Sequence, residues 1–259
     1  MVDLLKLSGK NIVIMGVANE RSIGWGVAKA LFSVGANVIF TYRKDRSRDK
    51  LEKALAKSEF TATQIVQCDV NSDESIEQAF KSIGEHVGVI HGVVHSIAFA
   101  HQQDLHNPFV ETTREGYAFA QDSSAYSLVA AAREARHYMT EGGAIITMSY
   151  LGAERVLEGY NVMGVAKAAL EASVRYLASE LGEQNIRVNA ISAGAVRTLS
   201  AKGVPSFNTI LSQIEERAPL KRNVKPEEVS DMTVAMLSSL SSGVTGEVIY
   251  VDAGYHIMG

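Results

Sequence analysis

Cysteine and proline are both scarce in this chain of 259 residues. Cys68 is its one cysteine, so an internal disulfide is impossible. The four prolines form no Pro-rich stretch, and there is no repeat or low-complexity segment that would indicate a linker between domains. At this length, a hydrophobic content of 46% is enough for one large core. We therefore expect a single domain over residues 1–259.

Long runs of one residue type are missing as well. No block of lysines and arginines reaches the length of a nucleic-acid-binding tail, and the formal net charge is −4 with a pI near 6.0. No apolar run approaches the roughly 20 residues that span a bilayer, and the N-terminus lacks the apolar core and cleavage site of a signal peptide. These absences argue against nucleic acid and membrane as partners, and we expect a cytoplasmic protein.

The chain does contain an alternation of two kinds of segment. Short apolar segments rich in β-branched residues predict strands near residues 11–15, 37–41, 63–67, 92–95, 144–148, 187–191 and 248–251. Helical patterns lie between them, near residues 26–33, 44–57, 73–85, 115–139, 163–181 and 226–239. Apolar strands separated by helices are typical of a parallel sheet that is covered on both faces. The pattern predicts an α/β fold of the Rossmann type, a doubly wound parallel sheet of about seven strands.

The turn after the first predicted strand has features of a phosphate-binding loop. Gly16 follows the strand directly, and Gly24 comes just after Ser22 and Ile23. Glycines let the backbone approach a pyrophosphate at a helix N-terminus, where free N–H groups and the helix dipole favour an anion. The spacing is wider than G-x-G-x-x-G, so a turn that merely needs glycine is the alternative. We predict that Gly16, Ser22 and Ile23 bind a dinucleotide.

Arg43 and Lys44 follow the second predicted strand, where the adenosine ribose of a dinucleotide would lie. An acidic residue there would hold the 2′-hydroxyl of NAD, whereas arginine and lysine suit a 2′-phosphate. The sequence therefore favours NADPH as cofactor. Asp45 and the possibility of a solvated basic helix start keep NADH open as the alternative.

Further cofactor-binding candidates lie at the ends of later strands, where open parallel sheets bind their ligands. Each one alone is equally consistent with an ordinary turn, and the prediction depends on their recurrence. The candidates are Asp69 and Val70 beside the adenine, Ser96, Ile97 and Ala98 along the ribose and pyrophosphate, and Val196 and Thr198 beside the nicotinamide. No metal site is predicted.

Tyr160 stands seven positions before Lys167 at the start of a predicted helix. Seven residues are about two helical turns, so the two side chains share one face. A phenolic O–H can donate to an oxygen on which negative charge develops, and a nearby ammonium would lower the pKa of that phenol. The pair suits stabilisation of an enolate, although an ordinary amphipathic helix can give the same spacing by chance.

These stretches resemble the short-chain dehydrogenase/reductase superfamily, and within it the FabI-type enoyl-[acyl-carrier-protein] reductases, over essentially the whole chain. The matching residues are 16–23, 95–100, 150–152, 160–167, 185–194 and 197–202. Most members of the superfamily carry Tyr-x-x-x-Lys with a serine about thirteen positions before the tyrosine. Counted back from Lys167, these positions hold Met163 and Tyr150. Tyr160, at the wider spacing, is similar to the tyrosine of enoyl reductases.

The resemblance implies an NAD(P)H-dependent reduction of trans-2-enoyl thioesters, carried by acyl carrier protein, in type II bacterial fatty acid elongation. Tyr160 would donate to the thioester carbonyl oxygen, Lys167 would hold the nicotinamide ribose, and Tyr150 would assist near the carbonyl. The implied substrate pocket consists of Ala98, Phe99, Ala100, Tyr150, Tyr160, Met163 and Phe207, with a mobile segment near residues 195–210. A homotetramer is the assembly that the resemblance implies.

Two other functions remain open at this point. One is a ketone or alcohol dehydrogenase on the same fold, against which Met163 argues because a thioether cannot donate a proton. The other is a non-catalytic protein that senses NADPH, against which the presence of both Tyr160 and Lys167 argues.

Overall fold

A seven-stranded parallel sheet forms the centre of the computed structural model, which describes residues 4–198 and 207–258. The strands are β1 (Asn11–Met15), β2 (Asn37–Tyr42), β3 (Gln64–Gln67), β4 (Gly92–His95), β5 (Gly143–Ser149), β6 (Ile186–Ala193) and β7 (Val248–Val251). Their order in the sheet is β3-β2-β1-β4-β5-β6-β7, and every neighbouring pair is parallel. The predicted α/β fold of the Rossmann type is confirmed.

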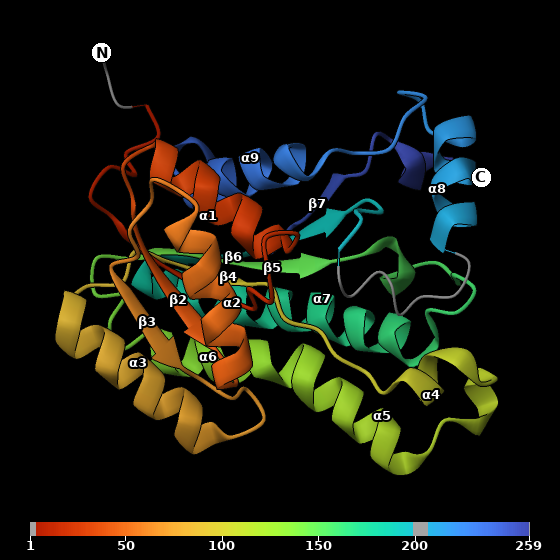
Figure 1. Ribbon diagram of the computed structural model, residues 1–259, viewed down its shortest axis with the longest axis horizontal. Coiled ribbons are helices and arrows are strands. Elements are labelled where there is room, and N and C mark those ends of the chain that lie inside the picture. The colour runs from red at the N-terminus through yellow and green to blue at the C-terminus, as the bar shows by residue number, and fades with distance from the viewer. Residues whose placement is uncertain (1–3, 199–206, 259) are drawn as a thin grey trace.

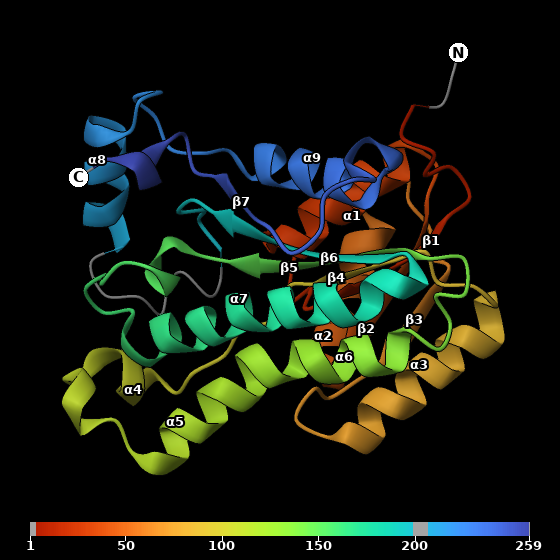
Figure 2. The same cartoon turned by 180° about the vertical axis from the view of Figure 1, so that it is seen from behind.

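Helices cover both faces of this sheet (Figures 1 and 2). One face carries α1 (Ile23–Ser33), α2 (Asp45–Ala56) and α9 (Pro226–Leu237), and the other carries α3 (Asp73–Val87), α6 (Ser127–Ala135) and α7 (Asn161–Leu181). A separate apolar core fills each interface, with Leu31 and Phe40 on the first face and Phe80 and Leu128 on the second. Residues 12–15 of β1 are all buried, which is why the central strands read as continuous apolar runs.

The strand order reverses between β1 and β4, which lie side by side in the sheet. From β1 the sheet continues outward through β2 and β3, and from β4 it continues on the other side through β5 and β6. The helices that connect the strands of these two halves therefore lie on opposite faces of the sheet. A crevice at the carboxyl ends of such strands is where open α/β sheets bind their ligands. In Figure 1 the carboxyl ends of β5 and β7 point toward α4 (Gln102–His106) and α8 (Phe207–Arg217), two helices that border this end of the sheet.

The structure differs from the sequence predictions mainly on the second face. All seven strands lie where predicted, within two residues at each end, whereas α4 and α8 were not predicted. The segment expected as one helix over residues 115–139 is helical from Arg114 to Ala135, but it is not one regular α-helix. The chain forms α5 (Arg114–Gln121), a π-helical turn over Asp122–Tyr126, and then α6.

The π-helical turn coincides with two serine hydroxyls that bond to backbone groups, one inside the helix and one outside it. The Ser127 hydroxyl donates to the Ser123 carbonyl oxygen at 2.8 Å, four residues earlier. The Ser124 hydroxyl donates to the Phe99 carbonyl oxygen at 3.2 Å and accepts from the Phe99 N–H at 3.0 Å. Side-chain bonds of this kind disturb regular helical pairing, and π-turns are frequent at functional sites.

Candidate active site

The loop between β1 and α1 is shaped to receive a phosphate. Gly16 has φ +91°, and a methyl group there would lie 2.1 Å from the carbonyl oxygen of Ser96 at the end of β4. Glycine is therefore required where the two central strands come together. The Ser22 hydroxyl accepts hydrogen bonds from the N–H groups of Ala18 and Asn19, at 3.0 and 3.1 Å, and so orders the loop.

The start of α1 supplies the groups that an anion needs. The Ser22 carbonyl accepts the N–H groups of Trp25 and Gly26, so the helix begins directly after Ser22. The first N–H groups of a helix have no partner within it and carry the positive end of the helix dipole. Gly24 is buried, and a methyl group there would lie 3.3 Å from a methyl of Ile14 on β1, so helix and strand pack closely. This loop fits the pyrophosphate of a dinucleotide.

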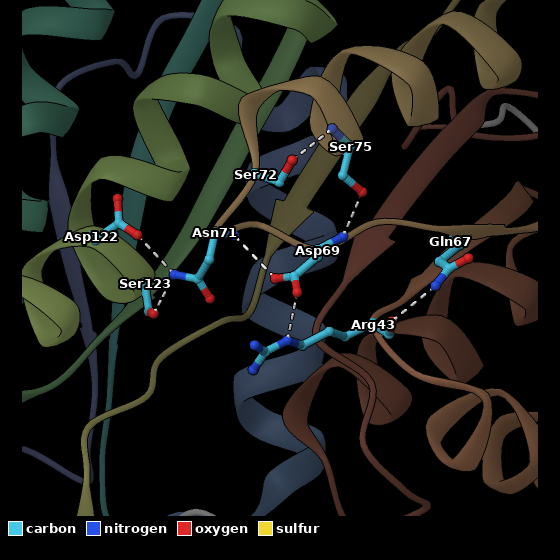
Figure 3. Close-up of polar contacts among 8 residues, drawn as sticks. All are labelled: Arg43, Gln67, Asp69, Asn71, Ser72, Ser75, Asp122 and Ser123. Carbon is cyan, nitrogen blue, oxygen red and sulfur yellow. Dashed lines mark hydrogen bonds and ion pairs between the residues drawn. The ribbon is translucent and has the colours of Figure 1, made fainter.

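Arg43 and Asp69, predicted separately from the ends of β2 and β3, form an ion pair (Figure 3). The Arg43 Nε donates to Asp69 Oδ2 at 2.9 Å, and the two side chains are 44% and 35% exposed. The Asp69 backbone N–H donates to the Ser75 hydroxyl at 2.9 Å, which ties the end of β3 to the first turn of α3. Lys44 is exposed and precedes α2, and Val70 is buried.

Asn71 joins this corner to the π-helical turn (Figure 3). Its Nδ2 donates to Asp122 Oδ2 at 2.8 Å and to the Ser123 hydroxyl at 2.7 Å, while its backbone N–H donates to Asp69 Oδ1 at 3.1 Å. Sequence reasoning did not find Asn71, because its partners lie about 50 residues away in the chain.

Lys167 is buried on α7 at the carboxyl end of β5. Its Nζ donates to the Met148 carbonyl oxygen at 2.6 Å, and the side chain is 5% exposed. Burial lowers the pKa of Lys167 to about 8, and the Glu171 carboxyl one turn later opposes this shift. Glu171 accepts a hydrogen bond from the Ser149 hydroxyl, and burial raises the pKa of its carboxyl.

Tyr150 and Tyr160 lie edge to face, with ring centroids 5.0 Å apart and an interplanar angle of 72°. Burial raises the pKa of Tyr150 to about 12 and raises that of Tyr160 well above its usual range, with Tyr150 and Glu171 adding to the latter. The expectation that Lys167 lowers the pKa of the Tyr160 phenol is therefore wrong, because burial dominates. A phenol that stays neutral retains the O–H that a developing oxyanion needs.

Two residues that sequence reasoning missed hold Tyr160 in place. A methyl group on Gly152 would lie 2.3 Å from Cδ1 of the Tyr160 ring, so glycine makes room for the ring. Asn161 adopts φ +41°, a conformation that asparagine tolerates better than most residues, and its Nδ2 donates to the carbonyl oxygens of Leu105 and Asn107 at 3.1 and 2.9 Å. The positive φ occurs just after Tyr160, at the start of α7.

His95 forms a buried polar network beneath this site. His95 Nδ1 lies 3.0 Å from the Thr147 hydroxyl and His95 Nε2 lies 2.9 Å from the Ser127 hydroxyl. The Thr147 hydroxyl also donates to the His95 carbonyl oxygen at 3.2 Å, and the Ser127 hydroxyl donates to the Ser123 carbonyl oxygen at 2.8 Å. Burial, with a contribution from Lys167, lowers the pKa of His95 to about 3. The imidazole is therefore neutral near pH 7, and both of its ring nitrogens lie beside hydroxyl groups.

The remaining residues predicted for the substrate pocket lie after β4, at the start of α8 and on α7. Phe99, half exposed, contacts Phe119 edge to face at 5.7 Å, beside Ala98 and Ala100 after β4. On the other side, a small pocket is lined by Tyr150, Leu151, Ser192, Ala193, Gly194, Ala195, Ile214, Asp252 and Tyr255. Phe207 packs against the apolar cluster of Ala195 and Ile214 at the start of α8. Met163 is buried on α7.

Of the segment predicted near residues 195–210, residues 199–206 lie outside the described part of the chain. The described beginning contains a tight turn in which the Thr198 N–H donates to the Val196 carbonyl oxygen at 2.8 Å. Val196 is buried, three residues after the end of β6. Among the residues described, no group of three or more histidine, cysteine or acidic side chains could hold a metal ion. Nor is any helix in the described ranges long and apolar enough to cross a membrane.

A doubly wound parallel sheet, a glycine-containing phosphate loop at its reversal point and a Tyr/Lys pair on the adjoining helix together define a dinucleotide-dependent reductase of the short-chain dehydrogenase/reductase type. Comparison with known families makes this assignment specific. The family model described as enoyl-(acyl carrier protein) reductase matches residues 16–256, and the chain belongs to this family.

Individual relatives agree on the family and differ in cofactor. The chain is 56% identical over 253 residues to the enoyl-[acyl-carrier-protein] reductase [NADH] FabI of Bacillus cereus, covering 98% of this chain and 99% of that protein. It is 58% identical, with the same coverage, to the enoyl-[acyl-carrier-protein] reductase [NADPH] FabI of Staphylococcus aureus MRSA252. A crystal structure of the B. cereus enzyme with NADP+ and indole naphthyridinone superposes with a TM-score of 0.95, at 56% identity and 98% coverage of both chains.

Proposed function

We propose that this protein is an enoyl-[acyl-carrier-protein] reductase that reduces the carbon–carbon double bond of trans-2-enoyl thioesters. The single observation that carries the proposal is the arrangement around Tyr160. Tyr160 packs on Tyr150, above Gly152 and at the N-terminus of the helix that carries Lys167. Met163, at the position of the ketoreductase tyrosine, is buried and has no proton to donate.

A nicotinamide cofactor would supply the hydride, and the protein's own side chains would manage charge and position. The neutral Tyr160 phenol would donate to the thioester carbonyl oxygen as negative charge develops there. Lys167, held against the Met148 carbonyl by one of its three N–H bonds, has two left for the ribose hydroxyls. Tyr150 would close the same side of the pocket, and Phe99 and Phe207 would border the acyl chain.

For the cofactor we propose NADPH over NADH. Arg43 and Lys44 directly follow β2, where the adenosine ribose of a dinucleotide would lie, and the Arg43 guanidinium would bind the 2′-phosphate. Hydrogen bonds to charged groups are worth roughly 1.5–3 kcal/mol, so one such contact to a 2′-phosphate can discriminate tenfold or more. The relatives named for NADH and for NADPH are about equally similar to this chain, at 56% and 58% identity.

The reaction is tested by following NADPH oxidation at 340 nm with crotonyl thioester and with acetoacetyl thioester. Turnover of the first and not of the second is expected. Comparable turnover of the acetoacetyl substrate would favour the ketone dehydrogenase, and no turnover of either, with NADPH still bound, would favour a non-catalytic sensor. The same assay with NADH in place of NADPH gives the cofactor preference.

Two substitutions then separate the proposed roles. Tyr160→Phe keeps the ring and removes the donor, so kcat should fall by up to ~10²–10³ with cofactor affinity nearly unchanged. Lys167→Ala should weaken NADPH binding as well as turnover. A Lys167→Ala protein that binds NADPH as tightly as the unmodified protein would refute the ribose contact.

We further propose a cytoplasmic homotetramer that accepts substrate from acyl carrier protein. The aromatic side chains of Tyr117 and Tyr126, on α5 and the π-helical turn, and of Tyr176 on α7 are exposed. Aromatic residues on helix surfaces are enriched at subunit contacts. Light scattering coupled to gel filtration should give four times the monomer mass, and a monomeric mass would exclude the assembly.

A further inference from the structure

The Arg43 guanidinium lies next to one anion, the Asp69 carboxylate, and is proposed to bind a second, the 2′-phosphate. Its Nε is already bound to Asp69 Oδ2 at 2.9 Å, and the proposed function gives the same group to a 2′-phosphate. Figure 3 draws no further contact from its two terminal nitrogens to the other residues shown. A guanidinium has five N–H donors but only one positive charge. A phosphate that binds the terminal nitrogens therefore shares this charge with the Asp69 carboxylate.

Asp69 is held in a fixed position at this corner. Its Oδ1 accepts the Asn71 N–H at 3.1 Å, and its own N–H is bound to Ser75 at the start of α3. Asn71 is anchored in turn to Asp122 and Ser123 (Figure 3). The carboxylate therefore cannot follow Arg43 if the guanidinium swings toward a ligand, and the ion pair weakens as the ligand binds.

NADH and NADPH would affect the Arg43–Asp69 ion pair differently. A 2′-hydroxyl makes little demand on a cation, so an NADH molecule leaves the Arg43–Asp69 pair intact. A 2′-phosphate must draw on the same guanidinium and lie near a carboxylate of its own sign, which is unfavourable. We infer that Asp69 is a specificity-determining residue that competes with the 2′-phosphate for Arg43 and so limits the preference for NADPH. This inference rests on the proposed role of Arg43.

The effect of this competition is modest, because both side chains are more than one third exposed. Exposed ion pairs of this kind stabilise weakly and are screened by salt. Removing the carboxylate should therefore raise the preference for a 2′-phosphate by about two- to fivefold at low salt, and by less at high salt.

The test measures binding of two cofactor fragments, adenosine 2′,5′-bisphosphate and adenosine 5′-monophosphate, by calorimetry on the full-length protein. Any contact of Asp69 with the adenine is common to both fragments and cancels in the ratio of their Kd values. Asp69→Asn removes the charge and keeps an oxygen for the Asn71 N–H. Asp69→Ser, which also keeps an oxygen acceptor, is the second variant if Asp69→Asn does not fold.

Arg43→Gln and the double variant Arg43→Gln/Asp69→Asn complete a double-mutant cycle. The charge control is Glu141→Gln, which breaks another exposed ion pair, Glu141 with Lys10 at 3.5 Å, at the amino end of the sheet. We expect Asp69→Asn to raise the preference for the bisphosphate about two- to fivefold in the unmodified background and to leave it unchanged beside Arg43→Gln. Glu141→Gln should change nothing.

The results that overturn the inference differ from those that overturn the proposed cofactor. If Arg43→Gln abolishes the preference but Asp69→Asn lowers it, then Asp69 holds Arg43 in place, and if Asp69→Asn leaves it unchanged, Asp69 has no effect on it. In both cases Asp69 does not compete, while the NADPH proposal stands. If Glu141→Gln gives the same rise, the effect is one of net charge and the inference fails. If Arg43→Gln leaves the preference unchanged, Arg43 is not the phosphate ligand and both proposals fail.

Discussion

Gly152→Ala tests whether the position of the Tyr160 ring sets the rate. The added methyl would lie 2.3 Å from Cδ1 of the ring, whereas ordinary contacts begin near 3.4 Å. The ring must therefore shift by about 1 Å, since the Gly152 backbone is held on its other side by α7, where a methyl on Gly164 would lie 2.7 Å from the Gly152 carbonyl oxygen. A misplacement of about 1 Å at a catalytic group can cost about 10² in rate.

We expect Gly152→Ala to lower kcat about 10- to 100-fold while the NADPH Kd stays near that of the unmodified protein. The matched control is Gly182→Ala, the same substitution just after the other end of α7. Gly182 has helical φ and ψ of −59° and −36°, and an added methyl there has no neighbour within 4 Å. Steady-state kinetics, fluorescence titration of NADPH and thermal unfolding would be measured for both variants.

The control should keep its kcat and its stability. A folded Gly152→Ala protein with kcat within twofold of the unmodified enzyme would refute the reasoning, because the phenol would then tolerate displacement. An equal loss in both variants would also refute it, since the effect would not be specific to the Tyr160 ring.

Three further outcomes follow from the site. Because the pKa of Lys167 is lowered to about 8 and the ammonium is the form that donates to a ribose, NADPH affinity should fall as pH rises through about 8, and in Lys167→Arg it should not. The pKa of His95 is about 3 in the folded protein and ~6.5 in the unfolded chain, so between these pH values only the unfolded chain binds a proton at His95. The free energy of unfolding should therefore fall by about 2–3 kcal/mol from pH 7 to 4.5, and urea titrations should show a smaller pH dependence in His95→Gln. Asn161→Gly keeps the positive φ and removes two hydrogen bonds to the end of α4, so amide exchange in residues 101–107 should accelerate while the rest of the chain is unaffected.

The sheet could be predicted from the sequence because its central strands are buried on both faces. Continuous apolar segments such as residues 11–15 cannot belong to a helix with a solvated face, and their alternation with helices leaves few folds to consider. A turn that needs glycine directly after β1 could be predicted as well, and Gly16 has φ +91° there. The binding of a dinucleotide by this loop stays a prediction. The predicted helix does run through residues 122–126, but its π-helical form there could not be predicted, because regular spacing of apolar residues does not reveal a π-helical turn.

Within the candidate site, residue types could be predicted but their partners could not. Arg43 and Asp69 are 26 residues apart and meet because β2 and β3 are neighbours in the sheet, which no local pattern specifies. The direction of the Tyr160 pKa shift was missed for a related reason. Spacing along a helix placed Lys167 nearby, but the depth of burial, which decides the shift, depends on the whole fold.

The π-helical turn fixes the length of the chain between α5 and α6. Each residue of a helix advances the chain by about 100° around the helix axis. The loss or gain of one residue at this turn would therefore rotate α5 relative to α6 by that angle about the axis. Asp122 and Ser123 would then face away from Asn71, and Gly116 on α5 would leave the buried Asp104 side chain against which it packs. Among homologous proteins, insertions and deletions should therefore be rarer in this helix than substitutions.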